Sequence, residues 1–460
     1  MKKVFLLFVL VFLACSEPLD RSIDVNELQE TTTTISISEV ENTTTTAIQQ
    51  EIETTESVEN LGDPVYLSVE STTQLLDGCK PFKGSSVKVE CLSYGKIITS
   101  FSFENEVVDI TSFKNNFYVI LKRGQIYQLN IESGEKKLFL DYSDKVSFIG
   151  EGGVLSLAFN SIGNDFVVSY VNTQGELIFE LNLYENNVFD VVNKKILLKL
   201  KNNARVHFAG NVIWSEYFND YIASIGDFTD NAENPRFNSI PQDTSTPLGK
   251  IILLQKKVEY TKNFVDTSAK EDEQLSNILA LGLRNPWKFF EVNNQLYIFD
   301  VGLYDYEEVN VLPYDSLPQN FGWPYFEGYE KSKDIAEVDS YTLDLQFDHK
   351  IYKDINEYLE YETLMPLLFY NHNVDNLANR FAVIGGDFIL DPMSDFNFSI
   401  VFADFLSDEI FLYNIYENIL KIVPVDTIAG ATSIKYLASN KVLVTTTSGF
   451  VHIIELPNSN

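Results

Sequence analysis

From about residue 65 onwards, apolar and polar residues alternate over runs of four or five positions, and short polar turns separate these runs. Phe117–Leu121 and Gln125–Leu129 flank the turn Lys122-Arg123-Gly124, a pattern that predicts a β-hairpin. Similar runs return five more times along the chain, at 166–170 with 177–181, 221–224, 296–299, 400–403 with 410–413, and 442–446 with 450–454.

The regular return of this pattern favours one particular all-β architecture. The copies follow one another at intervals of roughly 40–80 residues, the behaviour of propeller blades that carry loop insertions. A β-sandwich would also explain alternating strands, but it would not explain their regular return. We therefore predict a six-bladed β-propeller over residues 65–457, with insertions at 259–280 and 330–365 that are polar, acidic and partly helical in pattern. The turns that open the six copies lie at Asn115, Asp165, Asp220, Asn294, Asn397 and Asn440.

The first 62 residues have a different composition. Met1-Lys2-Lys3 and the apolar run Val4–Ala14 are typical of a secretory signal peptide and too short to span a bilayer. Cys15 follows in a sequence that resembles a bacterial lipobox, so we expect a signal peptide over 1–15 with lipidation at Cys15; cleavage and release is the alternative. Residues 16–62 are rich in Thr and Glu and are expected to form a disordered tether, or else a glycosylated stalk. This predicts an extracytoplasmic protein that contacts a membrane only through a lipid anchor.

Composition narrows the classes of partner and compartment. The chain has 34 Phe and 24 Tyr against 3 Met, a bias that favours strands. Its net charge of −32 argues against nucleic acid or an anionic membrane surface as a partner. In an exported protein, Cys79 and Cys91 are expected to form a disulfide, the alternative being two free thiols.

Polar groups that could bind a ligand cluster in the middle of the chain. An arginine and an amide lie on a proline-containing turn in Leu281–Trp287 (LGLRNPW), and the loop Asp300-Val301-Gly302 follows one strand later. Four further stretches occur in order with it: Gly150–Phe159 (GEGGVLSLAF), His207–Asn211 (HFAGN), Gln242-Asp243 with Leu248–Ile251 (LGKI), and Asn320–Gly328 (NFGWPYFEG). With these motifs, residues 85–455 resemble the glucose/sorbosone dehydrogenase family, the soluble PQQ-dependent aldose dehydrogenases.

The resemblance implies a specific site and reaction. It implies that a PQQ- and Ca²⁺-dependent oxidoreductase acts on aldose sugars or sugar alcohols and passes electrons to a separate acceptor. His207 matches the general base, Arg284 and Asn285 match residues that contact the cofactor, and the carbonyls of Gly302 and Leu303 match calcium ligands. The late cations that would neutralise the PQQ carboxylates have no clear match, although Arg380, Lys421 and Lys435 are candidates.

Other interpretations remain open for the same residues. His207 could be a structural histidine, and Arg284 could tie neighbouring blades through backbone carbonyls or Asp300. On a strand, Glu307 and Glu308 point to opposite faces, so we expect one to be buried against Arg284 and the other solvated. The acidic loop 227–233 is either a second calcium site or a solvated loop. The alternative functions are a non-catalytic propeller that binds carbohydrate or protein on the same rim, and a calcium-dependent lactonase.

Overall fold

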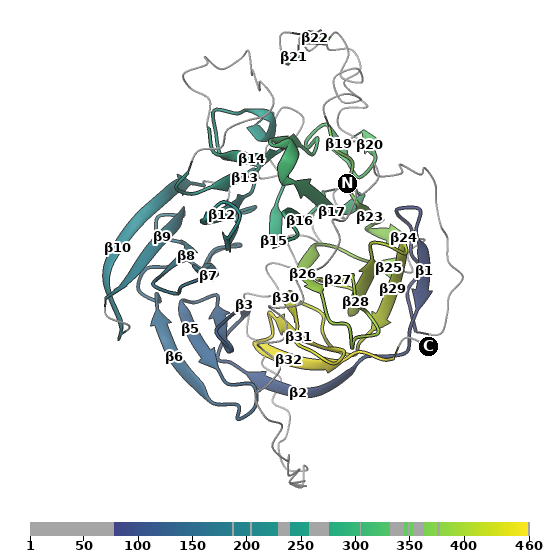
Figure 1. The fold of residues 1–460 in the computed structure, drawn as a ribbon, viewed down its shortest axis with the longest axis horizontal. Coiled ribbons are helices and arrows are strands. Elements are labelled where there is room, and N and C mark those ends of the chain that lie inside the picture. Colours follow the sequence, from purple (N-terminus) through teal and green to yellow (C-terminus); the bar gives the residue numbers. More distant parts are fainter. Residues whose placement is uncertain are drawn as a thin grey trace, which may run out of the picture. The chain divides into compact units, whose positions relative to one another are not determined.

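Each predicted run forms the second strand of a propeller blade, and in four of the six blades its predicted partner forms the third. A computed structural model of the chain describes residues 78–185, 188–202, 205–228, 240–256, 276–303, 305–331, 345–347, 350–352, 363–374 and 378–458. These residues contain six blades arranged around a central axis (Figure 1). The fold expected from the sequence, an all-β six-bladed propeller, is therefore confirmed. The signal peptide, Cys15 and the tether lie outside the described residues.

The first three blades follow one another along the chain, each with its first strand next to the axis. Neighbouring strands in each sheet are antiparallel, except that β18 joins blade 3 in parallel. Blade 1 contains β3 (Val107–Phe113), β4 (Asn116–Leu121), β5 (Gln125–Leu129) and β6 (Lys136–Asp141). Blade 2 contains β7 (Val154–Phe159), β8 (Asp165–Val171), β9 (Glu176–Glu185) and β10 (Val188–Lys201). Blade 3 contains β11 (Ala209–Ser215), β12 (Asp220–Ile225), β13 (Lys250–Leu253), β14 (Ile278–Leu281) and β18 (Gln319–Asn320).

Strands from the start of the chain complete the last blades. The strand β2 pairs with β32 beside the C-terminus, which closes the ring, and β1 adds to blade 5 in parallel with β29. Blade 4 contains β15 (Pro286–Val292), β16 (Gln295–Asp300), β17 (Tyr306–Pro313) and β23 (Leu368–Asn371). Blade 5 contains β26 (Val383–Ile389), β27 (Ser399–Asp404), β28 (Glu409–Asn414), β29 (Ile419–Pro424) and β1 (Lys88–Cys91). Blade 6 contains β30 (Ala431–Tyr436), β31 (Lys441–Thr446), β32 (Phe450–Glu455) and β2 (Lys96–Ser102).

Small elements decorate the blades. Two 3₁₀ turns, η4 (Ile240–Gln242) and η6 (Tyr314–Ser316), lie in connections, and within the described part of the chain there is no α-helix, hence no helix able to cross a bilayer. The short hairpins are β19 (Phe326–Glu327) with β20 (Glu330–Lys331), β21 (Leu345–Phe347) with β22 (Lys350–Tyr352), and β24 (Asn373–Val374) with β25 (Ala378–Asn379). One predicted insertion, 259–280, is wrong at its end, because 278–280 belong to β14. Apolar runs of four residues without clear alternation are easily missed when they lie fully inside a blade.

The six first strands form a closed ring. Each packs against the first strand of the next blade, in the order β3, β7, β11, β15, β26 and β30, and β30 packs back on β3. Every one of these strands also carries a bulge or register shift near its start. Since a bulge re-aims the side chains that follow it, polar residues can face the axis at this level while apolar residues pack between the blades.

Candidate active site

The candidate site consists of loops at one end of the first strands of blades 3 and 4. His207 lies just before β11, and Asp227 lies just after β12. Arg284 and Asn285 lie just before β15, and Asp300 ends β16. In an antiparallel blade, the start of the first strand and the end of the second lie at the same edge. The fold therefore brings together residues from separate motifs.

His207 is held between a carboxylate and a guanidinium. Its Nδ1 lies 2.7 Å from Asp227 Oδ1, and its Nε2 lies 3.0 Å from Nη2 of Arg284. Because a guanidinium can only donate, Nε2 must accept this bond, and we assign the proton to Nδ1. The backbone N–H of His207 donates to Glu151 Oε2 at 2.7 Å, and the imidazole is buried, with 3% of the residue exposed. The contacts therefore place the lone pair of the imidazole on Nε2, where it accepts the bond from Arg284. Nε2 is the ring atom that would accept a proton from a hydroxyl group.

Three N–H groups of the Arg284 side chain donate hydrogen bonds to other residues of the protein. Nη1 donates to the carbonyls of Val301 at 2.9 Å and Gly302 at 2.8 Å, and Nη2 donates to His207. The residue is 1% exposed, and its Nε finds no acceptor among the described residues. A guanidinium carries five donors, so Nε–H and one N–H of Nη2 remain. A buried donor without a partner is costly, which indicates that an oxygen atom of a ligand could complete this group.

Asp227 has a second partner that fixes its direction. Trp323 Nε1 donates to Asp227 Oδ2 at 3.0 Å, while Oδ1 accepts the bond from His207. The indole ring of Trp323 also lies beneath the guanidinium of Arg284, with 5.8 Å between Cζ and the ring centroid. Trp323 thus supports both neighbours of the imidazole.

Asp300 shapes the turn that presents Arg284 and Asn285. Its Oδ2 accepts the N–H of Arg284 at 2.9 Å, and its Oδ1 accepts the N–H of Asn285 at 2.7 Å. Burial raises the pKa of Asp300 to about 7, and these two bonds oppose that rise. The Asn285 Oδ1 accepts the N–H of Ala209 at 3.1 Å, which ties blade 4 to blade 3. Its contact with a cofactor stays a prediction.

The residues matched to a calcium site are engaged with protein groups. The Gly302 carbonyl accepts from Arg284, and the Leu303 N–H donates to Glu327 Oε1 at 2.7 Å. A calcium ion binds six to eight oxygens at about 2.4 Å, and at the Gly302 carbonyl it would share the oxygen with the positively charged guanidinium. Repulsion between the two cations disfavours calcium at that carbonyl, and we assign no calcium ligand there.

The two adjacent glutamates do point to opposite faces, but both are buried, so the expectation that one is solvated is wrong. Glu307 accepts from backbone N–H groups of blade 5, whereas Glu308 Oε1 accepts from Gly328 at 2.6 Å and its Oε2 from Asn310 at 3.1 Å. Burial raises the pKa of Glu308 well above its usual value. Within the described part of the chain, neither carboxylate bonds to the Arg284 side chain; Glu307 bonds to the loop before β26 and Glu308 to the hairpin β19–β20.

Two of the three late cations have partners away from the candidate site, and the third lies near the axis. Arg380 is fully buried and forms an ion pair with Glu409, with 2.9 Å between Nε and Oε2. Lys421 lies over the ring of Phe396 at 5.6 Å. Lys435 is near enough to Lys288 to repel its charge. Most of the acidic loop 227–233 lies outside the described residues, so its two interpretations stay open.

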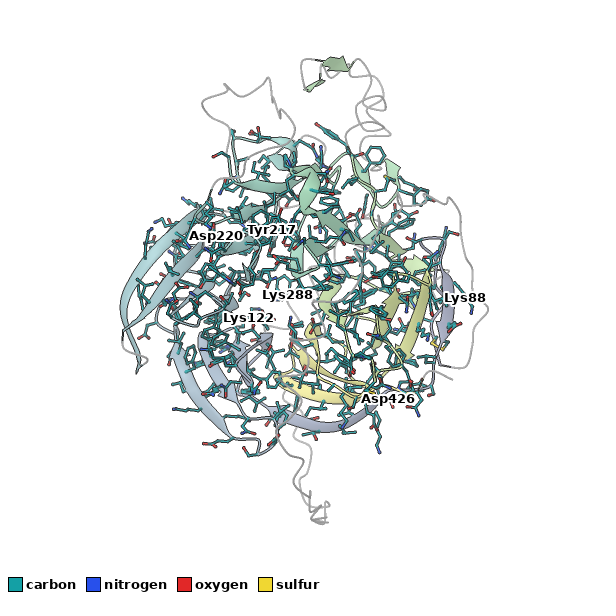
Figure 2. The ribbon with its side chains drawn as sticks, viewed as in Figure 1. Lys88, Lys122, Tyr217, Asp220, Lys288 and Asp426 are labelled. Atoms are coloured by element: carbon teal, nitrogen blue, oxygen red, sulfur yellow. A yellow bond between two sulfur atoms is a disulfide. The ribbon has the colours of Figure 1, made fainter. Side chains whose placement is uncertain are left out.

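A belt of polar side chains lies on the ring of first strands. Lys288 of β15 lies at the centre of the ring in Figure 2, and its Nζ lies 2.7 Å from Asp109 Oδ2 on β3. The hydroxyl oxygen of Ser156 of β7 lies 3.3 Å from Asp109 Oδ2 and 3.1 Å from Asn211 Oδ1 of β11, and its single O–H can donate to either. The belt therefore connects four first strands across the axis.

Comparison with solved structures agrees with the fold expected from the motifs. A glucose dehydrogenase is 12% identical to the chain, with a TM-score of 0.55, and the match covers 79% of this chain and 99% of that one. The apo form of the soluble aldose sugar dehydrogenase of Escherichia coli is 14% identical, with a TM-score of 0.54 and coverage of 78% and 98%. The chain has the fold of the soluble sugar dehydrogenases. At this identity, the likeness establishes the sugar dehydrogenase fold alone.

Sequence comparison adds little. The HIPL1 protein of Arabidopsis thaliana is 30% identical over 128 residues, which is 27% of this chain and 16% of that protein. The chain thus spans a small part of that relative's length. No family model matches the chain.

Several site residues were not singled out from the sequence. Glu151 and Trp323 lie inside two of the family-like motifs, and Asp227 opens the acidic loop, but none of them was assigned a role beside His207. Their contacts depend on loops of three blades meeting, which sequence spacing does not reveal. The signal available was the position of Gly226-Asp227 directly after a strand that ends at the predicted rim.

Proposed function

We propose that the protein is an oxidoreductase that oxidises an aldose or a sugar alcohol at the His207 site, with a quinone of the PQQ type as oxidant. The substrate hydroxyl would lose its proton to His207 Nε2 while its carbon loses a hydride, leaving a carbonyl group, or a lactone if the substrate is an aldose. The single observation that carries the proposal is the imidazole fixed between Asp227 and Arg284 with its lone pair on Nε2.

Asp227 and Arg284 would have different roles beside the imidazole of His207. Asp227 would hold the Nδ1 proton in place and stabilise the imidazolium that forms when Nε2 takes a second proton, the arrangement used by other Asp–His pairs. For the substrate to reach Nε2, its hydroxyl must replace the N–H of Arg284. The freed guanidinium donor would then lie close to the oxygen on which negative charge develops.

The donors of Arg284 also suit a quinone. Its unpartnered Nε–H and spare Nη2–H would hold a carbonyl or carboxylate oxygen of the cofactor. The bound quinone supplies the two-electron chemistry that these side chains lack. A separate electron acceptor must then regenerate it. We assign no step to calcium, because the guanidinium already engages the Gly302 carbonyl.

An envelope location completes the proposal. Cys79 and Cys91 form a disulfide, which supports an oxidising compartment. We propose export through the signal peptide and attachment by a lipid at Cys15. Labelling of the expressed chain with a fatty-acid analogue, compared between the wild type and Cys15→Ser, tests the anchor; equal labelling would contradict it.

The oxidation is tested by reconstitution. The purified chain is incubated with PQQ, with and without Ca²⁺, and reduction of an artificial dye is followed across a panel of aldoses, sugar alcohols and non-sugar alcohols. We expect sugar-dependent reduction that survives removal of calcium by a chelator. No reduction with any sugar, together with no PQQ binding at micromolar concentration, would contradict the proposal.

A second candidate is a non-catalytic propeller that binds carbohydrate on the same rim. It is favoured by the direct bond between Arg284 and His207, because that bond occupies the lone pair on Nε2. Calorimetric titration with the same sugars separates the two. Sugar binding without PQQ binding and without dye reduction would favour this candidate.

A further inference from the structure

Glu307 joins two blades at the edge of the candidate site. It lies on β17 and is 1% exposed. Its Oε2 accepts the N–H of Gly302 at 3.2 Å and that of Val383 at 2.9 Å, and its Oε1 accepts the N–H of Ala382 at 2.9 Å. One carboxylate therefore holds the loop after β16 in blade 4 against the loop before β26 in blade 5.

His372 is the fourth partner of this carboxylate. It follows β23, is buried, and places Nε2 2.6 Å from Glu307 Oε1. Its ring packs on Phe381 with 4.8 Å between centroids. Burial alone would lower the pKa of His372, but the charge of Glu307 reverses this, and the pKa lies above its usual value. When protonated, this imidazole lies next to the carboxylate of Glu307 and balances its charge.

The contacts run without a gap from Glu307 to the imidazole of His207. Glu307 fixes the N–H of Gly302, and the carbonyl of Gly302 accepts from Arg284 Nη1. The other terminal nitrogen of Arg284 donates to His207 Nε2. Gly302 has little freedom to relax, because a Cβ there would lie 1.7 Å from the carbonyl oxygen of Tyr306. A shift of this loop would therefore be passed to the guanidinium.

We propose that Glu307, balanced by His372, is a positioning residue that sets where the Arg284 guanidinium meets His207. The inference rests on the proposed oxidation for its kinetic consequence only, since the geometry of the imidazole can be read without any cofactor. Glutamine cannot replace Glu307, because its amide has one acceptor oxygen for three backbone N–H donors and turns an NH₂ group toward at least one of them.

The chain supplies a matched control. Glu308 is the next residue on β17 and is also buried; it pairs in register with Asp300 but bonds to Gly328 and Asn310, and among the described residues no bond joins it to the Gly302 loop. Glu307→Gln and Glu308→Gln thus place the same new side chain on opposite faces of one strand, and only the first removes an acceptor from the Gly302 loop. His372→Gln is a second variant, which keeps the Glu307 carboxylate and removes only its charge partner.

The first readout is the ¹⁵N spectrum of the histidines in the chain without cofactor. The sequence has four histidines, so the His207 signals can be assigned by comparison with His207→Gln. We expect Glu307→Gln to shift the Nε2 signal of His207, His372→Gln to shift it less, and Glu308→Gln to leave it unchanged. An unchanged His207 signal in folded Glu307→Gln would overturn the inference. If Glu307→Gln does not fold, His372→Gln decides by the same criterion.

The second readout is kinetic. A loop displaced by a fraction of an ångström commonly lowers kcat by about 10–100-fold, and we expect a loss of that size for Glu307→Gln with a smaller change in KM. Glu308→Gln should keep kcat within about threefold of wild type. Equal kcat in both variants would overturn the inference. Failure of the wild-type chain to oxidise sugars would count against the proposed function and leave the spectral test of Glu307 in force.

Discussion

Removing one partner of the Lys288–Asp109 pair tests whether the belt across the axis holds the ring together. Both side chains are buried, with 8% and 7% exposed, and the two charged atoms lie 2.7 Å apart. Burial lowers the pKa of Lys288, and the charge of Asp109 opposes this effect. In Asp109→Asn the ammonium would lose its charge partner and keep at most the neutral amide oxygen of the new side chain and a long contact of 3.5 Å to Asn211 Oδ1.

The expected magnitude follows from that loss. An uncompensated buried charge costs about 3–5 kcal/mol, so Asp109→Asn should lower the free energy of unfolding by that amount near neutral pH. Lys288→Met leaves Asp109 with the N–H of Ile110 and the hydroxyl of Ser156, so we expect a smaller loss of about 2–4 kcal/mol. The double variant removes both charges and should be less destabilised than the sum of the single variants by at least about 2 kcal/mol.

The assay is urea denaturation followed by tryptophan fluorescence and by circular dichroism, with free energies compared only where the two transitions coincide. A lysine with a lowered pKa destabilises the folded state while it is charged, and this cost disappears as the lysine loses its proton at rising pH. The free energy of unfolding of Asp109→Asn should therefore recover in part under alkaline conditions. Additive losses in the double variant, or no pH dependence in Asp109→Asn, would refute the reasoning.

Three further predictions concern other parts of the molecule. Burial and the charge of Glu307 raise the pKa of Asp404 to about 8, so the folded state holds this proton more tightly than the unfolded chain does. The free energy of unfolding should therefore fall as pH rises from about 4 to about 8, by up to about 1.4 kcal/mol per pH unit for this group. Thermal unfolding of Asp404→Asn should show a shallower fall with pH than the wild type. Replacing Cys79 and Cys91 by serine opens a loop with a sequence separation of 12 and should cost about 2–3 kcal/mol, measured as a lower denaturation midpoint; a midpoint equal to that of the oxidised wild type would contradict it. Asp227→Asn should lower kcat by about 10²–10⁴-fold in the reconstituted protein, with little change in quinone affinity, because the Nδ1 proton of His207 loses its carboxylate acceptor. A kcat close to that of the wild type would show that Asp227 does not act through His207.

The second strand of each blade was readable from the sequence because it alternates or is strongly apolar over at least four residues. Strand β14 was not, because its four buried residues follow a polar stretch and carry no period. The alternation of Glu307 and Glu308 was predicted from strand geometry alone, and it holds. Their shared burial could not be predicted, because it depends on the hairpin β19–β20 and on the loop before β26, which cover the two faces of β17.

In the candidate site, too, some features could be predicted from the sequence and others depend on how the loops fold. The motifs placed His207, Arg284 and Asn285 near one rim because each lies next to the start of a strand. The motifs could not show that Nη1 of Arg284 donates to the carbonyls of Val301 and Gly302, since those bonds depend on how the loop after β16 folds. For that reason, a calcium site at Gly302 looked compatible with the sequence.

The central claim is that Nε2 of His207 accepts the proton of a sugar hydroxyl. The most direct measurement compares sugar-dependent dye reduction by the PQQ-reconstituted wild type, His207→Gln and His452→Gln, in which the control histidine lies on β32 and bonds to Ser100. We predict that kcat falls by about 10²–10⁴-fold in His207→Gln, with quinone affinity preserved, and is unchanged in His452→Gln. A His207→Gln variant that oxidises sugars at the wild-type rate would contradict the claim.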